Sequence, residues 1–191
     1  MTLITRWTSD DLAHLPELPG VRYEILDGDL YVATAPSFDH QYALDMLGDT
    51  LRAWSRATGR GLAMSTPGLI FAPDQNAIPD LIWISAARLQ GALDAARHFI
   101  RAPELVVEIL SPGALNEHRD TDRKRSLYGR QGVEEYWIVD PQARTVTLYH
   151  LVQGVLEARA TLGETDTLTS PLLPGFACPV ASLWPPSALP V

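Results

Sequence analysis

Apolar positions along this chain form two kinds of pattern. Residues 78–84, 105–110 and 135–139 are apolar at almost every position and rich in branched side chains. Such runs are typical of strands that are covered on both faces of a sheet. The segment after Ser37 instead repeats apolar residues at helical spacing. These are Leu44, Leu47, Leu51 and Trp54. The two patterns predict an α/β fold in which helices flank a mixed central β-sheet.

Turn and capping residues predict further elements. Thr8 to Asp11 has the character of a capped helix start. Asp27-Gly28 between two apolar stretches predicts an N-terminal hairpin of residues 21–26 and 29–34. The remaining expected elements are strands at 61–65 and 69–72, helices from Ser85 to Ala96 and from Asp120 to Gly129, and a strand from Arg144 to Val152 that pairs with 135–139.

We expect the 191 residues to form one domain, because the length permits a sizeable core and no repeat or linker interrupts it. The expected core spans about residues 20–152. The Pro-rich segment from about 171 to 191 has no periodicity. We interpret it as a tail that is either packed against the core or frayed.

The composition indicates a cytoplasmic protein with no membrane partner. No apolar stretch is long enough to span a bilayer, and the N-terminus lacks the features of a secretory signal. Cys178 is the only cysteine, which suits a reducing compartment. The net charge of −8 argues against broad affinity for nucleic acid, although it does not exclude a local basic face.

Three carboxylates interrupt the apolar pattern. Glu24, Asp80 and Glu108 each lie within a segment of predicted strand. A buried carboxylate is strongly unfavourable unless a cation, a metal ion or hydrogen-bond donors compensate it. Three such positions suggest one shared partner, and a divalent metal ion is the economical candidate.

Asp80 and Glu108 fall near the middle of two predicted strands that a helical segment connects. If these strands pair, both carboxylates converge at one point on the sheet surface. Carboxylate, carbonyl and water oxygens are the ligands that Mg²⁺ and Mn²⁺ prefer. The alternative is structural, with each acid paired to an arginine or capping a helix N-terminus.

A series of motifs runs through most of the chain. They are Tyr23–Gly28, Pro36 with His40, Pro79-Asp80, Val107–Pro112, Asp122–Lys124, Tyr128 and Gly132–Pro141. Together they resemble the PD-(D/E)XK superfamily of restriction endonuclease-like nucleases, and most closely its Uma2 family. The resemblance implies a restriction endonuclease-like core and the metal-dependent hydrolysis of DNA phosphodiester bonds.

The resemblance also implies roles for individual residues. Asp80 and Glu108, with the carbonyl of Ile109, would bind Mg²⁺ or Mn²⁺. The superfamily pattern places a lysine two residues after the second acid, where this chain has Leu110. The lysine that matches is Lys124 on the next predicted helix, from which a long side chain can still reach the attacking water.

Three of these positions also have simpler interpretations. Lys124 fits an i,i+4 pair with Asp120 on an exposed helix. Glu24 either completes the catalytic site, as a ligand or by holding a metal-bound water, or pairs with Arg22 on an exposed hairpin. His40 either faces the same cleft as an accessory residue or is a polar residue at a helix start.

The arginines around Lys124 form the most basic stretch of the chain, diluted by Glu117, Asp120 and Asp122. They either contact DNA phosphates or form a solvated helix face. A homodimer would suit the cleavage of both strands, although no sequence feature demonstrates it. Three functions remain: a metal-dependent endonuclease, a catalytically silent nuclease-fold binding or interaction module, and a structural protein with paired acids. The combination of Asp80, Glu108 and Lys124 favours the endonuclease.

Overall fold

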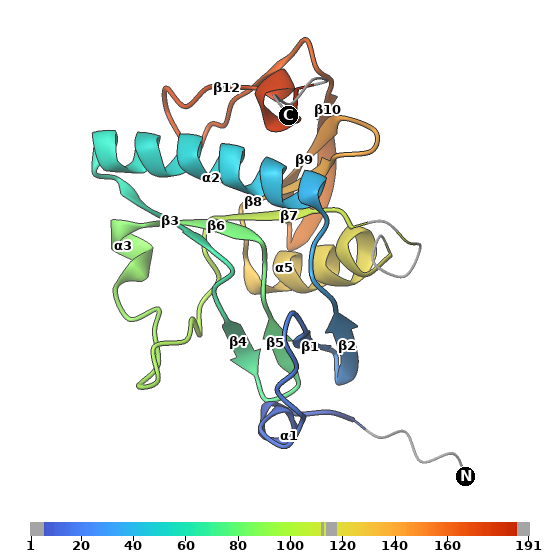
Figure 1. Cartoon of the computed structure of the whole chain (residues 1–191). Coiled ribbons are helices and arrows are strands. Elements are labelled where there is room, and N and C mark those ends of the chain that lie inside the picture. The colour runs from blue at the N-terminus through green and yellow to red at the C-terminus, as the bar shows by residue number, and fades with distance from the viewer. Residues whose placement is uncertain (1–5, 112, 114–117, 187–191) are drawn as a thin grey trace.

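The computed structural model describes residues 6–111, 113 and 118–186, and its centre is a six-stranded mixed sheet (Figure 1). The strand order is β10-β9-β8-β7-β6-β3, with β7 and β8 parallel and the other neighbours antiparallel. The strands are β3 (Gly61–Ser65), β6 (Leu81–Ser85), β7 (Leu105–Ile109), β8 (Glu135–Asp140), β9 (Thr145–Val152) and β10 (Val155–Leu162). This arrangement confirms the predicted mixed sheet and the pairing of 144–152 with 135–139.

Helices cover both faces of this sheet, as predicted. Helix α2 (Phe38–Thr58) lies on one face, and α5 (Arg125–Gln131), preceded by the π-helical turn η1 (Arg119–Lys124), lies on the other (Figure 1). The pleat of β7 divides its side chains accordingly, because successive residues of a strand face opposite sides. Val107 packs in the core on the α2 side, whereas Val106 packs on the α5 side.

Local signals position the start of α2. The Ser37 side chain accepts a hydrogen bond from the backbone N–H of His40, and Gly59 ends the helix at φ +66°. The buried stripe includes Leu44, Leu47 and Leu51. The predicted helix is confirmed, and its cap places His40 in the first turn, at the end of the helix nearest the small sheet.

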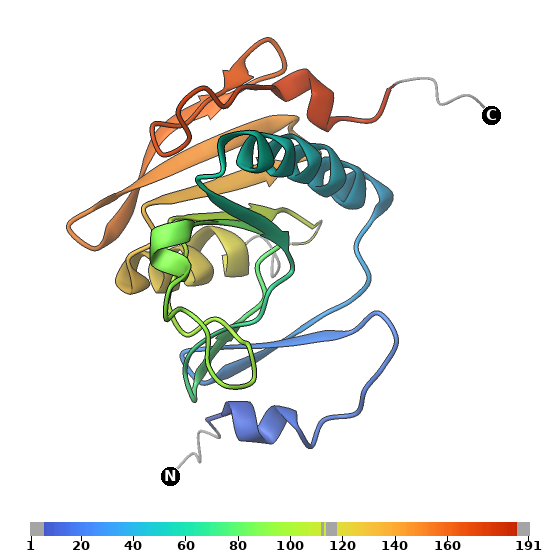
Figure 2. The ribbon, with the colours of Figure 1, turned by 90° about the vertical axis from the view of Figure 1, so that its left-hand side faces the viewer.

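A second, four-stranded sheet has the order β2-β1-β5-β4 and lies beyond α5 (Figures 1 and 2). Its strands are β1 (Arg22–Leu26), β2 (Asp29–Ala33), β4 (Leu69–Ala72) and β5 (Gln75–Ala77), and the short helix α1 (Ser9–Leu12) precedes them. Asp27 and Gly28 join β1 to β2 with φ of +52° and +79°, as a two-residue type I′ turn requires. The N-terminal hairpin is therefore confirmed.

The predicted helix from Ser85 to Ala96 is wrong in extent. Ser85 does cap a helix, but α3 (Ala86–Leu89) is a single turn. Gly91 then adopts a left-handed φ of +70°, and the chain folds back so that the Ile100 N–H bonds to the Ala92 carbonyl. Burial of Ala92 and Phe99 in the core overrides the helix propensity of this alanine-rich segment.

The chain continues beyond the expected core of residues 20–152. Strand β10 was not predicted, because its alternation is weak and most of its side chains are exposed. The segment that follows includes β11 (Thr167–Leu168), β12 (Cys178–Pro179) and the 3₁₀ helix η2 (Val180–Leu183). Leu173, Phe176 and Trp184 are buried in the core around α2, so the described part of the Pro-rich segment is packed. Residues 187–191 lie outside the described residues.

No helix in the described part of the chain is both long enough and apolar enough to cross a membrane.

Candidate active site

Strand register brings the two predicted metal ligands together. Leu81 pairs with Val107 and Ile82 with Val106, so extending this antiparallel register by one residue sets Asp80 opposite Glu108. Glu108 is the fourth residue of β7, whereas Asp80 directly precedes β6 instead of lying in the middle of a strand. The predicted pairing of these two segments is confirmed, and both acids lie on the face of the sheet that α5 covers.

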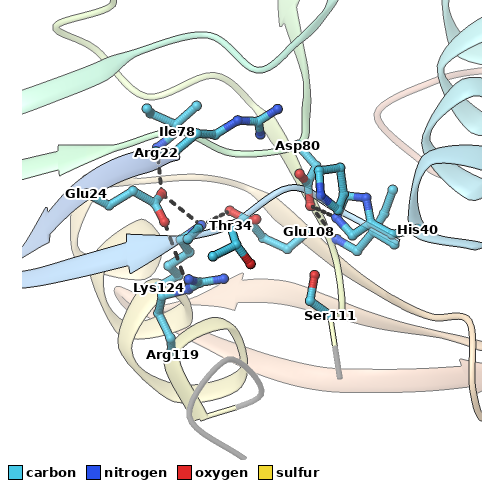
Figure 3. A pocket seen from close by; sticks show the side chains of 13 residues that line it. Arg22, Glu24, Thr34, His40, Ile78, Asp80, Glu108, Ser111, Arg119 and Lys124 are labelled. Carbon is cyan, nitrogen blue, oxygen red and sulfur yellow. Dashed lines mark hydrogen bonds and ion pairs between the residues drawn. The ribbon is translucent and has the colours of Figure 1, made fainter. Parts of the chain in front are cut away.

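Asp80 and Glu108 line a cavity of about 40 Å³ between the two sheets. The other predicted site residues line it as well: Glu24 from β1, His40 from α2, Ile109 from β7 and Lys124 from η1 (Figure 3). Six positions spread over 100 residues of sequence therefore meet at one place. Arg22, Thr34, Ser111 and Arg119 are also part of the lining.

Lys124 lies at the centre of this group with only 1% of its surface exposed. Its Nζ is 2.9 Å from Glu24 Oε1, 3.0 Å from Glu108 Oε1 and 3.6 Å from Asp120 Oδ1. The i,i+4 neighbour Asp120 is equally buried, so the alternative of an exposed surface pair is wrong. The shared cation of Glu24 and Glu108 in this structure is thus the ammonium of Lys124.

Asp80 has different partners. Its Oδ2 accepts a hydrogen bond of 2.8 Å from the backbone N–H of Ile109 and lies 3.2 Å from Nε2 of His40. His40 is 5% exposed and faces the cavity, which excludes a purely solvent-exposed helix-start role. Its Nδ1 has no hydrogen-bond partner among the described residues.

Glu24 contacts both Lys124 and the neighbouring strand segment. It accepts a hydrogen bond of 2.7 Å from the Ile78 N–H and lies 3.9 Å from Arg119 Nε. Glu24 is 3% exposed and makes no ion pair with Arg22 within the described residues, so the alternative of an exposed Glu24–Arg22 pair is wrong. Whether Glu24 takes part in catalysis stays a prediction.

Burial and charge shift the pKa values of these groups in different directions. Burial raises the pKa of Glu108 well above its usual value of 4.5, against the lowering effect of Lys124 and with further raising by the Asp80, Asp120 and Glu24 carboxylates. Burial lowers the pKa of Lys124, but the three carboxylates around it outweigh burial and raise it above 10.5. Lys124 is therefore a permanent cation.

The carboxyl of Asp80 shifts in the other direction. Burial raises its pKa, but the hydrogen bond and charge of His40, the charge of Lys124 and the Ile109 N–H outweigh this effect. The net pKa lies below the ordinary 3.8, so Asp80 is a carboxylate at neutral pH. The two strand acids thus differ, because the pKa of Asp80 is lowered whereas that of Glu108 is raised despite the charge of Lys124.

Sequence reasoning missed three members of the buried cluster. Arg119 binds Asp120 with two hydrogen bonds of 2.8 and 3.2 Å, and the Tyr128 hydroxyl donates one of 2.8 Å to Glu108 Oε1. Asp120, Lys124 and Tyr128 recur at every fourth position, which places them on one helix face. That spacing could have located Asp120 and Tyr128 beside Lys124, whereas Arg119 lies outside the series and gave no such signal.

The arginines around Lys124 do not form a free basic face among the described residues. Arg119 is buried, Arg123 pairs with Asp29, Arg125 with Asp122 and Arg130 with Asp27. The predicted contact of this stretch with phosphate therefore has no support from this arrangement. Glu117 and Pro112 of the motifs above lie outside the described residues.

The donor chemistry of the site is compatible with Mg²⁺. Among the described residues no three His, Cys, Asp or Glu side chains are arranged to hold a metal ion. Mg²⁺, however, is commonly held by one or two carboxylates and keeps several water ligands. Asp80 and Glu108 supply two carboxylates, and a cavity of about 40 Å³ has room for water molecules beside them.

Comparisons with known proteins agree with this fold. The sequence matches the model of the family Uma2, described as "Putative restriction endonuclease", over residues 9–181. Among solved structures, a protein from Anabaena variabilis, described as "a putative nuclease belonging to DUF820", matches with a TM-score of 0.74 and 18% sequence identity. The match covers 92% of this chain and 96% of that chain, which confirms the predicted fold. No curated protein matches the sequence.

Proposed function

Because the chain belongs to the Uma2 family of restriction endonuclease-like proteins, we propose that it is a metal-dependent endonuclease that hydrolyses DNA phosphodiester bonds. One observation carries the proposal. Asp80 and Glu108 stand opposite each other at the edge of two paired strands, and Lys124 Nζ lies 3.0 Å from Glu108 in the same cavity. Two carboxylates and a fixed cation are the groups that this hydrolysis needs.

We assign Asp80 and Glu108, with the Ile109 carbonyl, as the ligands of Mg²⁺ or Mn²⁺. When bound, the ion lowers the pKa of a coordinated water and neutralises charge that develops on the phosphate. His40 Nε2 and the Ile109 N–H both contact Oδ2 of Asp80 and hold the carboxylate in place. The two donors limit the rotation of Asp80, which favours a single orientation of the carboxylate toward the cavity.

Lys124 orients the attacking water and stabilises negative charge on the phosphate. Glu24 and Asp120 hold its ammonium independently of Glu108, at 2.9 and 3.6 Å. The lysine therefore keeps two anchors even when Glu108 turns toward another cation. This gives Glu24 and Asp120 the role of positioning residues and removes the need for a lysine on β7 itself.

The first prediction concerns the two acids. Purified protein is expected to nick or cleave plasmid DNA in the presence of Mg²⁺ or Mn²⁺, and cleavage should stop when EDTA is added. Asp80→Asn and Glu108→Gln each keep the side-chain shape but remove a ligand charge, so cleavage should fall by about 100-fold or more. Gel analysis of supercoiled, nicked and linear plasmid measures the loss.

Glu135→Gln is the matched control. Glu135 is also a buried acid, 2% exposed, but it binds Trp137 and Ser170 on the α2 side of the sheet. This variant should lose stability without losing specific activity. Undiminished cleavage by Asp80→Asn or Glu108→Gln, with the same metal requirement, would refute the assignment of the site.

A catalytically silent nuclease-fold module is the second candidate, and one observation favours it. Each of the three acids already has protein donors, so no buried charge needs a metal for compensation. Calorimetric titration with Mn²⁺ separates the candidates, because only the enzyme should show binding heat that Glu108→Gln removes. If that variant also proves as stable as the wild-type protein and EDTA changes nothing, a structural role for the paired acids is supported instead.

A further inference from the structure

Arg22 lines the cavity of the candidate carboxylates without a partner for its charge. It is the first residue of β1, two positions before Glu24, so both side chains project from the same face of the strand. Figure 3 shows its guanidinium extending beside Ile78 in the direction of Asp80. Within the described residues Arg22 makes no side-chain hydrogen bond and no ion pair, although it is only partly exposed.

The other two cations of the cavity are already engaged. Lys124 is shared by three carboxylates, and Arg119 makes a two-bond contact with Asp120 and lies close to Glu24. Their charges are largely compensated within the protein. Among the cations that line the cavity, Arg22 is therefore the one whose donors are left for an anion.

An anion in this cavity needs such a donor. Glu24, Asp80 and Glu108 all line it, and their charges repel a phosphodiester. The arginine fork matches the two non-bridging oxygens of a phosphate with parallel hydrogen bonds, which are among the strongest in proteins. Arg22 stands beside the proposed metal ligands, where the scissile phosphate has to lie.

A second hollow of about 350 Å³ adjoins the cavity and provides a path for the rest of the strand. The two share Ala33, Thr34, Ser111 and Arg119 in their linings. The hollow also includes Ser37, and none of the described residues that line it is a carboxylate. Hydroxyl groups commonly donate hydrogen bonds to the phosphates and sugars of nucleic acids.

We propose that Arg22 is the phosphate-binding residue of this site, holding the scissile phosphodiester of DNA through two N–H groups while the adjoining backbone follows the hollow lined by Thr34, Ser37 and Ser111. The proposal rests on the proposed function. It gives the hairpin β1–β2 a substrate-binding role in addition to its contribution of Glu24 to the buried cluster.

The test measures DNA binding apart from cleavage. Fluorescence anisotropy of a labelled DNA duplex, recorded in EDTA over a series of salt concentrations, gives the affinity and its salt slope for each variant. Arg22→Gln should weaken binding by about 10- to 100-fold, and the slope of log K against log salt should fall by about one. Arg22→Lys should restore the slope, since the charge returns, but only part of the affinity.

Arg56→Gln is the matched control. Arg56 is exposed in the last turn of α2, and it follows His40 by 16 positions, which correspond to about 24 Å of helix. This variant should bind and cleave like the wild-type protein. Thermal unfolding checks that each variant is folded. If Arg22→Gln does not fold, the affinity of Arg22→Lys tests the proposal instead. Wild-type affinity in Arg22→Lys would contradict phosphate binding through two hydrogen bonds.

The outcomes separate this proposal from the proposed function. If Arg22→Gln matches the wild-type affinity and salt slope while plasmid is cleaved, Arg22 has no phosphate-binding role but the endonuclease assignment stands. If binding depends on Arg22 but no metal supports cleavage, the endonuclease assignment fails and the phosphate-binding role stands. A wild-type protein that neither binds the duplex nor cleaves plasmid with Mg²⁺ or Mn²⁺ contradicts both.

Discussion

At the residue scale, Lys124 is the cation that balances the charge of the buried carboxylates around it. It is the only lysine of the chain, whose other basic side chains, apart from histidine, are arginines. A compact ammonium can approach three carboxylates at once, whereas the planar guanidinium of arginine favours a fork facing one or two of them. The one position where the sequence uses lysine is thus the position where three buried acids converge on a point.

Replacing this lysine tests the cluster directly. Lys124→Met removes the cation from three buried carboxylates, so the free energy of unfolding near neutral pH should fall by about 3–5 kcal/mol. Urea unfolding followed by tryptophan fluorescence measures the change. The free energy of unfolding of Lys124→Arg should lie between those of the wild-type protein and Lys124→Met, because arginine keeps the charge but not the geometry of the ammonium. A Lys124→Met variant as stable as the wild-type protein would show that the cluster is not formed in solution.

At the scale of elements, the hairpin β1–β2 is tied to α5 and η1 through its turn. Asp27 Oδ1 accepts hydrogen bonds of 2.7 Å from Arg130 and 2.6 Å from Gln75, and Arg123 donates one of 2.7 Å to Asp29. These bonds hold the hairpin that supplies Arg22 and Glu24 to the cavity. Arg123 and Arg130 therefore bind the hairpin, whereas Arg119 and Arg125 pair with Asp120 and Asp122, so these arginines leave no free basic face within the described part of the chain.

The turn makes stability depend on pH. Burial raises the pKa of Asp27, but Gln75, Arg130 and Arg123 outweigh it and keep the pKa below 3.8. Because the folded-state pKa is depressed, the Asp27 carboxylate stabilises the protein above pH 3.8, and this contribution is lost as the pH falls below it. Asp27→Asn, which tolerates the left-handed φ, should cost about 0.5–1 kcal/mol near neutral pH.

Urea unfolding across this pH range compares Asp27→Asn with the wild-type protein, and the difference should shrink in acid. A deficit of the same size on both sides of pH 3.8 would assign the effect to the turn itself and not to the ion pairs.

At the scale of the whole molecule, the C-terminal segment packs against elements far away in the sequence. The Phe176 ring lies 6.5 Å from Trp54 of α2 and 6.0 Å from Trp137 of β8, measured between ring centroids. The Trp54 indole also donates a hydrogen bond to the Pro174 carbonyl. We propose that residues 1–191 form one domain in which this segment unfolds together with the central sheet.

Phe176→Ala tests this proposal. Loss of a buried aromatic side chain should lower the free energy of unfolding by about 3–5 kcal/mol and shift a single transition. Circular dichroism and tryptophan fluorescence should report the same midpoint. Val155→Ala, which changes a side chain that is 60% exposed, should leave stability nearly unchanged. An early, separate transition in Phe176→Ala would show that the segment is an independent unit.

Several elements and part of the site followed from the sequence alone, because their signals lie within a few neighbouring residues. The Asp27-Gly28 turn, the Ser37 cap and the apolar runs of β6, β7 and β8 each encode their own structure. Asp80 and Glu108 could be paired in advance because they sit in two such runs. Propensity failed at 85–96, where a single helical turn followed by a chain reversal, anchored by buried Ala92, replaced the expected helix.

The sequence by itself determined that acids and a lysine would occupy the strands and helix around a central sheet. Only the tertiary structure decided how their charges pair, because Glu24 and Lys124 are 100 residues apart and no local pattern links them. It placed Asp120 and Arg119 inside the cluster and left Arg22 without a partner within the described residues. Buried charges require close partners, and the folded chain determines which partners are within reach.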